Sequence, residues 1–101
     1  MTIVQYAIIP IDPDARDEAI EALTELGEAS REEEGVVDYR VTTDVDDENT
    51  VRIFEEYEDE DAVNAHMTSE HFGAFQEQVG GFAGGPVELY KYDVEGKSQL
   101  M

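Results

Sequence analysis

The spacing of apolar residues alternates between two periods along this 101-residue chain, and the order of these periods limits the folds available to it. A period of two, typical of strands, occurs in four segments: 3–9, 36–43, 50–58 and 87–94. Helical spacing occurs in a long segment, 13–33, and in two shorter ones, about 59–67 and 69–82. The order β–α–β–β–α–β predicts an α+β fold, the ferredoxin-like motif with a four-stranded antiparallel sheet. We expect one domain over 1–94 and a C-terminal tail over 95–101.

Residues at the ends of the predicted helices agree with this assignment. Asp12 followed by Pro13 is a typical helix start, and Ser69 can cap the last helix. Gly35 follows the long helical segment, where a glycine commonly adopts the left-handed conformation that ends a helix. The glycines from Gly80 onward are expected to end the last helix at about Phe82.

Both faces of the predicted sheet are apolar, although helices would cover only one of them. The face away from the helices would carry Val4, Tyr6, Ile8, Phe54, Tyr90, Tyr92 and Val94. So much apolar area is rarely left in contact with water. A second copy of the sheet would cover it, so we expect a homodimer whose two sheets pack face to face as a dimeric α/β barrel.

The charge balance excludes several classes of function. Twenty-six acidic residues against six basic ones give a net charge of −20, which leaves no basic surface for nucleic acid or for an anionic membrane. The absence of cysteine excludes thiolate catalysis and cysteine-ligated metals. No apolar run is long enough for a transmembrane helix, and the N-terminus does not resemble a signal peptide, so a cytoplasmic location is expected. Such acidity is typical of proteins from salt-loving cells.

Two titratable residues are placed on apolar faces by the predicted elements. Glu55 shares its strand face with Val51, Ile53 and Tyr57, and a buried carboxyl group is a plausible proton-transfer group. With so many acids in the chain, its position could also arise by chance. His66 lies on the apolar face of the short helix, where it is either a core residue or a general base or orienting group beside Glu55.

Neither metal pattern in the sequence predicts a metal site. His71 follows His66 by five residues, which is not the i, i+4 spacing of a histidine pair on one helix. Asp44, Asp46 and Glu48, with Glu55, match positions 1, 3, 5 and 12 of a calcium-binding loop. The sixth position is Asn49 where glycine is required, so we interpret this segment as a solvated hairpin turn.

Four short segments resemble the antibiotic biosynthesis monooxygenase (ABM) family: EGVVDY (34–39), FEEYED (54–59), AVNAH (62–66) and SEHF (69–72). The family pattern places a glycine shortly before a tyrosine, an E-x-(W/Y) motif on a strand, and a histidine eleven residues after that glutamate. Here Glu55 and His66 have this separation. Tyr57 stands where many members have tryptophan. The resemblance implies a dimeric α/β barrel with a pocket between the sheet and the helices.

The resemblance also implies a function. Some members of the family are cofactor-free monooxygenases in which dioxygen oxidises a quinol, an anthrone or a similar phenol. On this basis Glu55 and His66 would form a catalytic proton-handling pair, and no cofactor or metal would be needed. Substrate contacts would come from Tyr39, Tyr57, His71 and Phe72, and we expect a pocket lined by Phe72, Phe75, Ile53 and Leu23.

Two alternatives remain. The first is a non-catalytic dimeric barrel that binds a small ligand or acts in a stress response. The second is haem degradation, as in a related group that uses a first-strand asparagine and a tryptophan. This alternative ranks low because the chain has no tryptophan and Gln5 is its nearest first-strand amide.

The net charge generates the first testable prediction. Lowering the ionic strength should destabilise the fold, because like charges on the surface repel one another more strongly as screening is lost. The midpoint of thermal unfolding should therefore rise between about 0.1 and about 3 M KCl. A midpoint that does not change with salt would contradict the assignment of the acidic surface to life at high salt.

Overall fold

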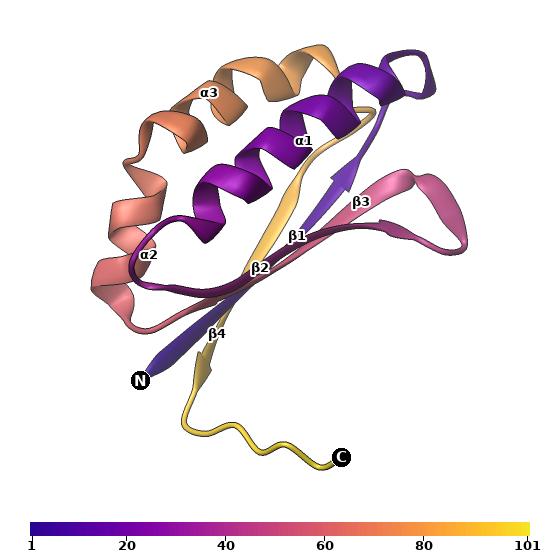
Figure 1. Ribbon diagram of the computed structural model, residues 1–101. Helices are drawn as coiled ribbons and strands as arrows, with labels where there is room; N and C mark the ends of the chain where they lie inside the picture. Colours follow the sequence, from indigo (N-terminus) through magenta and orange to yellow (C-terminus); the bar gives the residue numbers. More distant parts are fainter.

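The computed structural model describes residues 1–101, in which helices cover one face of a four-stranded antiparallel sheet (Figure 1). The strands lie in the order β2-β3-β1-β4, which confirms the predicted ferredoxin-like fold. The elements in chain order are β1 (Thr2–Pro10), α1 (Arg16–Arg31), β2 (Val36–Asp44), β3 (Asp47–Tyr57), α2 (Glu60–Met67), α3 (Glu70–Gln78) and β4 (Glu88–Val94). No helix is long and apolar enough to cross a membrane.

The helix starts agree with the sequence, whereas two helix ends differ. The Asp12 carboxylate accepts a hydrogen bond from the Asp14 amide, and a short 3-10 turn over 13–15 leads into α1. Side chains of Asp59 and Ser69 cap α2 and α3 in the same way. However, α1 ends at Arg31 rather than 33. The last predicted helix ends at Gln78 and is followed by a 3-10 turn over 79–81, where two glycines weaken helical structure.

Gly35 has a different role from the one predicted. No glycine in the structure has a positive φ, so Gly35 does not end α1 in the left-handed conformation. A Cβ atom at this position would lie 2.4 Å from the Cβ of Ala62, far inside van der Waals contact. Glycine is therefore required because α2 packs directly against the segment that connects α1 to β2.

The β2–β3 hairpin turns more tightly than the predicted segment 44–49, because β3 already begins at Asp47. The Asp44 carboxylate accepts a hydrogen bond from the Asp46 amide and pairs with Arg52 at 2.8 Å. Glu55 lies eight residues into β3 and faces the helices. The calcium-like pattern is therefore split between a surface turn and a buried strand position, in agreement with its interpretation as a turn.

The core lies between the sheet and the helices. Alternate residues of β1 and β3 face this layer, so Ile3, Ala7, Ile9, Val51 and Ile53 are buried. The apolar side of α1 packs onto them through Ala19, Leu23 and Leu26. Phe82, which follows α3, packs into the same cluster. A smaller group, Ile3, Tyr57 and Val63, fills the end of the layer beneath α2.

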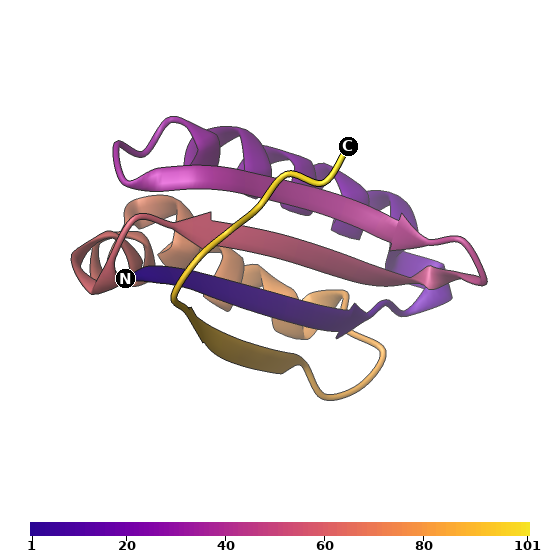
Figure 2. The same cartoon turned by 90° about the horizontal axis from the view of Figure 1, so that it is seen from below.

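The opposite face of the sheet is apolar and has no helix over it. Tyr6 lies beside Phe54 on β3 and Tyr90 on β4, and Tyr92 lies beside Val4. Phe54, Tyr90 and Tyr92 are 40–52% exposed. The tail after β4 crosses this face (Figure 2), where Lys97 pairs with Glu56 at 3.1 Å. A single strip of chain leaves most of these aromatic rings in contact with water.

The exposed face generates a prediction about assembly. The wild-type chain should sediment as a dimer in molar salt, because a second sheet would remove these aromatic rings from water. Tyr92→Glu should weaken this dimer, since it places a charge within the apolar face. Val45→Glu makes a comparable change in the fully exposed hairpin turn and serves as the control. A stable wild-type monomer would rule out the barrel.

Candidate functional site

A cavity of about 230 Å³ lies between the sheet and α3, and its walls are mostly apolar. Every strand contributes to it. The lining residues are Gln5, Ala7, Ile9, Leu26, Tyr39, Ile53, Glu55, Phe72, Phe75, Gln76, Val79, Val87 and Leu89. Five residues predicted for the site or its pocket are among them: Tyr39, Ile53, Glu55, Phe72 and Phe75. Leu23 is not, because it is fully buried in the core and Leu26, one turn further along α1, takes its place.

Glu55 is the acidic residue of this cavity. The alternation of β3 turns its side chain toward the helices, and only 4% of the residue is exposed. The Tyr57 hydroxyl donates a 2.6 Å hydrogen bond to Glu55 Oε1. Burial raises the pKa of Glu55 from 4.5 to about 7, the Tyr57 hydrogen bond lowers it, and the charge of Glu33 raises it. The carboxyl group therefore titrates near neutral pH.

Gln5 supplies a second polar group, one that the predictions did not place in the site. It lies directly opposite Glu55 in the β1–β3 pairing, so both side chains project from the same face of the sheet. Gln5 is buried, yet its carbonyl oxygen accepts no hydrogen bond. Such an orphaned acceptor is costly unless a ligand or water donates to it. The alternation of β1 already placed Gln5 on the inward face, but not beside Glu55.

The two predicted tyrosines occupy different positions. Tyr39 pairs with Glu55 across β2 and β3 and lines the cavity. Burial, and secondarily the charge of Glu55, raises the pKa of Tyr39 well above its usual value, so its phenol stays neutral. Tyr57 lies behind Glu55 and does not line the cavity. Its hydroxyl contacts the Glu55 carboxylate, and its side chain does not face the cavity.

The predicted direct contact between Glu55 and His66 is wrong. His66 Nδ1 lies 2.8 Å from Glu33 Oε2, whereas the hydrogen bond to Glu55 comes from Tyr57. The His66 ring packs among Tyr39, Tyr57 and Phe72 with centroid distances of 5.2–5.6 Å. The contacts of His66 near Glu55 are therefore with aromatic rings, among them Tyr57, which donates to the carboxylate. Burial lowers the pKa of His66, although the nearby Glu33 opposes this shift.

His71 shares the same partner, which the spacing argument did not foresee. Its Nε2 lies 2.7 Å from Glu33 Oε2. The i, i+4 rule applies to a single helix, but here α2 ends at Met67 and α3 begins at Glu70, so the two histidines approach Glu33 from different helices. His71 does not line the cavity of Glu55. The ligand atoms of Glu33, His66 and His71 all lie within 4.8 Å of one another, as metal ligands can.

Glu33 itself was not predicted as a functional residue. It follows Leu26 by seven residues and Ser30 by three, and both of these are buried. Helical spacing therefore places Glu33 on the inward side of α1, although the helix ends two residues before it. Among so many acids its position carried no distinguishing signal.

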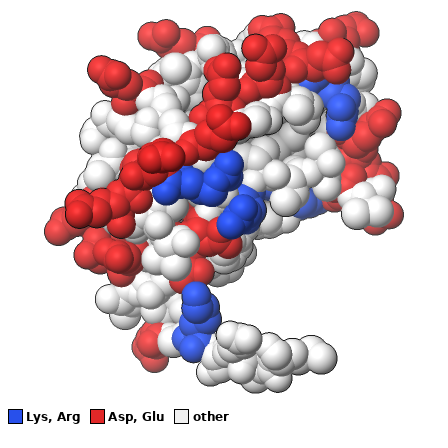
Figure 3. All heavy atoms as spheres, in the orientation of Figure 1, with Lys and Arg blue, Asp and Glu red and all other residues white.

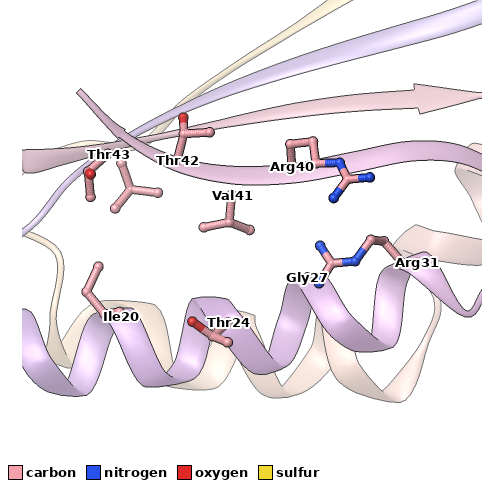
Figure 4. Close-up of a pocket in the computed structure, with 9 residues that line it drawn as sticks. Ile20, Thr24, Gly27, Arg31, Arg40, Val41, Thr42 and Thr43 are labelled. Carbon is pink, nitrogen blue, oxygen red and sulfur yellow. The ribbon is translucent and has the colours of Figure 1, made fainter. Parts of the chain in front are cut away.

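A separate groove of about 380 Å³ lies between α1 and the edge strand β2 (Figure 4). It shares no lining residue with the Glu55 cavity. Arg31 from α1 and Arg40 from β2 approach one another there, and Arg31 donates to the Tyr39 carbonyl while Arg40 pairs with Asp38. The residues that line the groove include no carboxyl, histidine or tyrosine side chain.

The raised pKa of Glu55 generates a prediction about stability. Because the folded state holds this proton more tightly than the unfolded state, Glu55 stabilises the fold below about pH 4.5 and loses that contribution as the pH rises through about 7. Glu55→Gln does not ionise. Its free energy of unfolding relative to wild type should therefore increase by about 3 kcal/mol between about pH 5 and about pH 9. Denaturant unfolding in high salt measures this difference.

Glu48→Gln is the matched control, since it removes an exposed acid from the same strand. An equal increase in this control, or no pH dependence in Glu55→Gln, would contradict the assigned burial of Glu55.

Comparisons with known proteins agree with this architecture. The family model described as antibiotic biosynthesis monooxygenase matches residues 2–78. A Bacillus subtilis protein named "Putative monooxygenase YcnE" is 36% identical over 73 residues, which cover 72% of this chain and 77% of that protein. The structure of Rv0793 from Mycobacterium tuberculosis superposes with a TM-score of 0.91 at 23% identity and covers 98% of this chain and 100% of its own, which shows a shared fold.

A Bacteroides thetaiotaomicron structure described as a "Putative antibiotic biosynthesis monooxygenase" has a TM-score of 0.85 and 29% identity, covering 99% of this chain and 95% of its own. The family model spans about three quarters of the chain, from β1 to the end of α3. It therefore includes every residue that lines the cavity except Val79, Val87 and Leu89. This chain belongs to the antibiotic biosynthesis monooxygenase family.

Proposed function

We propose that this protein is a cofactor-independent monooxygenase that oxidises a small quinol or related phenol with dioxygen. The observation that carries the proposal is the buried Glu55 carboxyl group, which has a pKa of about 7 and lines an apolar cavity. A general base is most effective when its pKa lies near the working pH. Glu55 would take the phenolic proton, and the apolar walls would keep water from the resulting anion.

The size and the polar groups of the cavity also favour one class of substrate. Its volume exceeds the roughly 150 Å³ of a cavity that holds benzene, and it therefore suits one or two fused rings. Phe72 and Phe75 offer aromatic surfaces on the helix side. The side-chain carbonyl of Gln5, which has no partner, and the Glu55 carboxylate can each accept a hydrogen bond. A ligand with two hydroxyl groups can donate to both. A hydroquinone-like molecule has this arrangement.

The substrate itself supplies all the electrons that reduce dioxygen. In a quinol whose ring has a carbon that carries hydrogen, or in a phenol with an activated CH₂ group, deprotonation gives an anion that transfers an electron to dioxygen, and that carbon is the one oxidised in the steps that follow. The two resulting radicals combine through a new C–O bond to form a hydroperoxide. Breaking its O–O bond releases water and leaves a carbonyl group. One oxygen atom enters the product, the other leaves as water, and no external reductant is consumed.

His66 has a positioning role in this proposal. Its ring packs against Tyr39, which lines the cavity, and against Tyr57, which binds Glu55. Its Nδ1 faces Glu33 rather than the cavity. It therefore helps to hold the aromatic residues around Glu55, whereas the proton transfer itself is assigned to Glu55.

This proposal predicts turnover that depends on Glu55. Oxygen uptake in high salt, measured with monocyclic and bicyclic hydroquinones and with anthrone, should show activity with at least one of them. Glu55→Gln should reduce kcat/KM by about 10²-fold or more, because the amide cannot accept the proton. Activity should rise with pH around a midpoint near 7, as the carboxylate forms.

Two variants sharpen the test. Glu56→Gln lies on the other face of β3 and should keep wild-type activity. Tyr57→Phe removes a hydrogen bond that lowers the pKa of Glu55, so the midpoint should move to higher pH. Binding of these phenols without oxygen uptake would instead support a ligand-binding protein and overturn the proposed activity.

A further inference from the structure

Three metal-ligating side chains from three segments meet beside the cavity of Glu55. Glu33 lies in the turn after α1, His66 in α2 and His71 at the start of α3. One carboxylate oxygen, Glu33 Oε2, lies 2.8 Å from His66 Nδ1 and 2.7 Å from His71 Nε2. None of the three residues lines the cavity of Glu55, so the cluster is distinct from the proposed catalytic site.

We propose that Glu33, His66 and His71 bind a divalent transition-metal ion, of which Zn²⁺ is the reference case. Ligand atoms about 2.0–2.2 Å from zinc lie roughly 3.3–3.6 Å from one another in a tetrahedral arrangement. The two separations from Glu33 Oε2 are shorter than this, at 2.8 and 2.7 Å, and the two histidine nitrogens lie within 4.8 Å of each other. Small side-chain movements would therefore produce three-ligand coordination.

The ligand set fits this class of ion. Two imidazole nitrogens with one carboxylate oxygen bind zinc and iron in proteins, and the set leaves a position open for water. Calcium and magnesium prefer sites composed of oxygen atoms, so two imidazoles disfavour them.

The surroundings supply access and electrostatic attraction. Glu33 forms part of the wall of an open hollow with Glu34, Glu58, Asp59 and Asp61, and no basic residue lines this hollow. The side chains of Glu33 and His71 are 16% and 25% exposed, whereas that of His66 is 1% exposed. An ion can thus reach the cluster from the surface, and the acidic groups around it raise the local concentration of cations.

A bound ion would join three parts of the fold. It would connect the end of α1 to α2 and α3, and through His66 it would restrain the ring that packs against Tyr39 and Tyr57. Its expected role is structural, because the three ligands lie outside the cavity. The inference therefore stands independently of the proposed oxygenase activity.

Calorimetric titration of the chelator-treated full chain with Zn²⁺ alone tests the site. Roughly 0.5 M salt should be present, because it screens diffuse binding of cations to surface carboxylates. We expect one ion per chain, and affinity at least tenfold weaker in Glu33→Gln and in His71→Gln. Glu34→Gln is the matched control, since it removes an acid from the same hollow but not from the cluster. It should retain wild-type affinity.

A spectroscopic measurement identifies the ligands directly. With Co²⁺ in place of Zn²⁺, paramagnetic shifts should appear on the ring protons of His66 and His71, which are the only histidines in the chain. The circular dichroism of each variant shows whether it is folded, and His71→Gln provides a test at a partly exposed position if Glu33→Gln unfolds. Absence of Zn²⁺ binding, equal affinity in all variants, or unshifted histidine protons would overturn the site.

Discussion

The inward face of β3 is the constraint on which both the core and the candidate site depend. This strand pairs with β2 on one side and β1 on the other, so its register fixes the neighbours of every residue along it. Val51 and Ile53 fill the core, and two positions further along the same face Glu55 enters the cavity. Sliding the strand by one residue would turn these side chains toward the uncovered face. Core packing thereby holds the carboxyl group in a position that opposes its ionisation.

Polar side chains between the sheet and the helices form two neighbouring sets, one around Glu55 and one around Glu33. Tyr57 binds Glu55, whereas Glu33 binds both histidines. His66 lies between the sets, because its ring contacts Tyr57 and Tyr39 while its Nδ1 faces Glu33. A change at Glu33 can therefore reach the cavity through the packing of aromatic rings, and its charge also raises the pKa of Glu55.

The acidic surface contrasts with this interior. Figure 3 shows Asp and Glu side chains along the helical side and the margins of the molecule, with Lys and Arg in only a few places. Almost all of this charge stays in water, where salt screens it. Buried carboxyl groups such as Glu55 have no such screening and depend on hydrogen bonds and on protonation. The same residue type therefore has two physical roles in one chain, and burial decides between them.

The order of elements, the inward faces of the strands and the helix caps at Asp12 and Ser69 could be predicted from the sequence, because they depend on local spacing and on neighbouring residues. The alternation of β3 was likewise enough to single out Glu55. The end of α1 at Arg31 and the conformation of Gly35 were less predictable. Glycine is needed at position 35 because Ala62, from a helix far away in the sequence, packs directly against it.

The pairing of polar groups was decided by the tertiary structure alone. Sequence separation placed His66 with Glu55 and separated it from His71, but the break between α2 and α3 brings both histidines to Glu33. Periodicity specifies the face on which a side chain lies, whereas its partner depends on how the helices pack across that face.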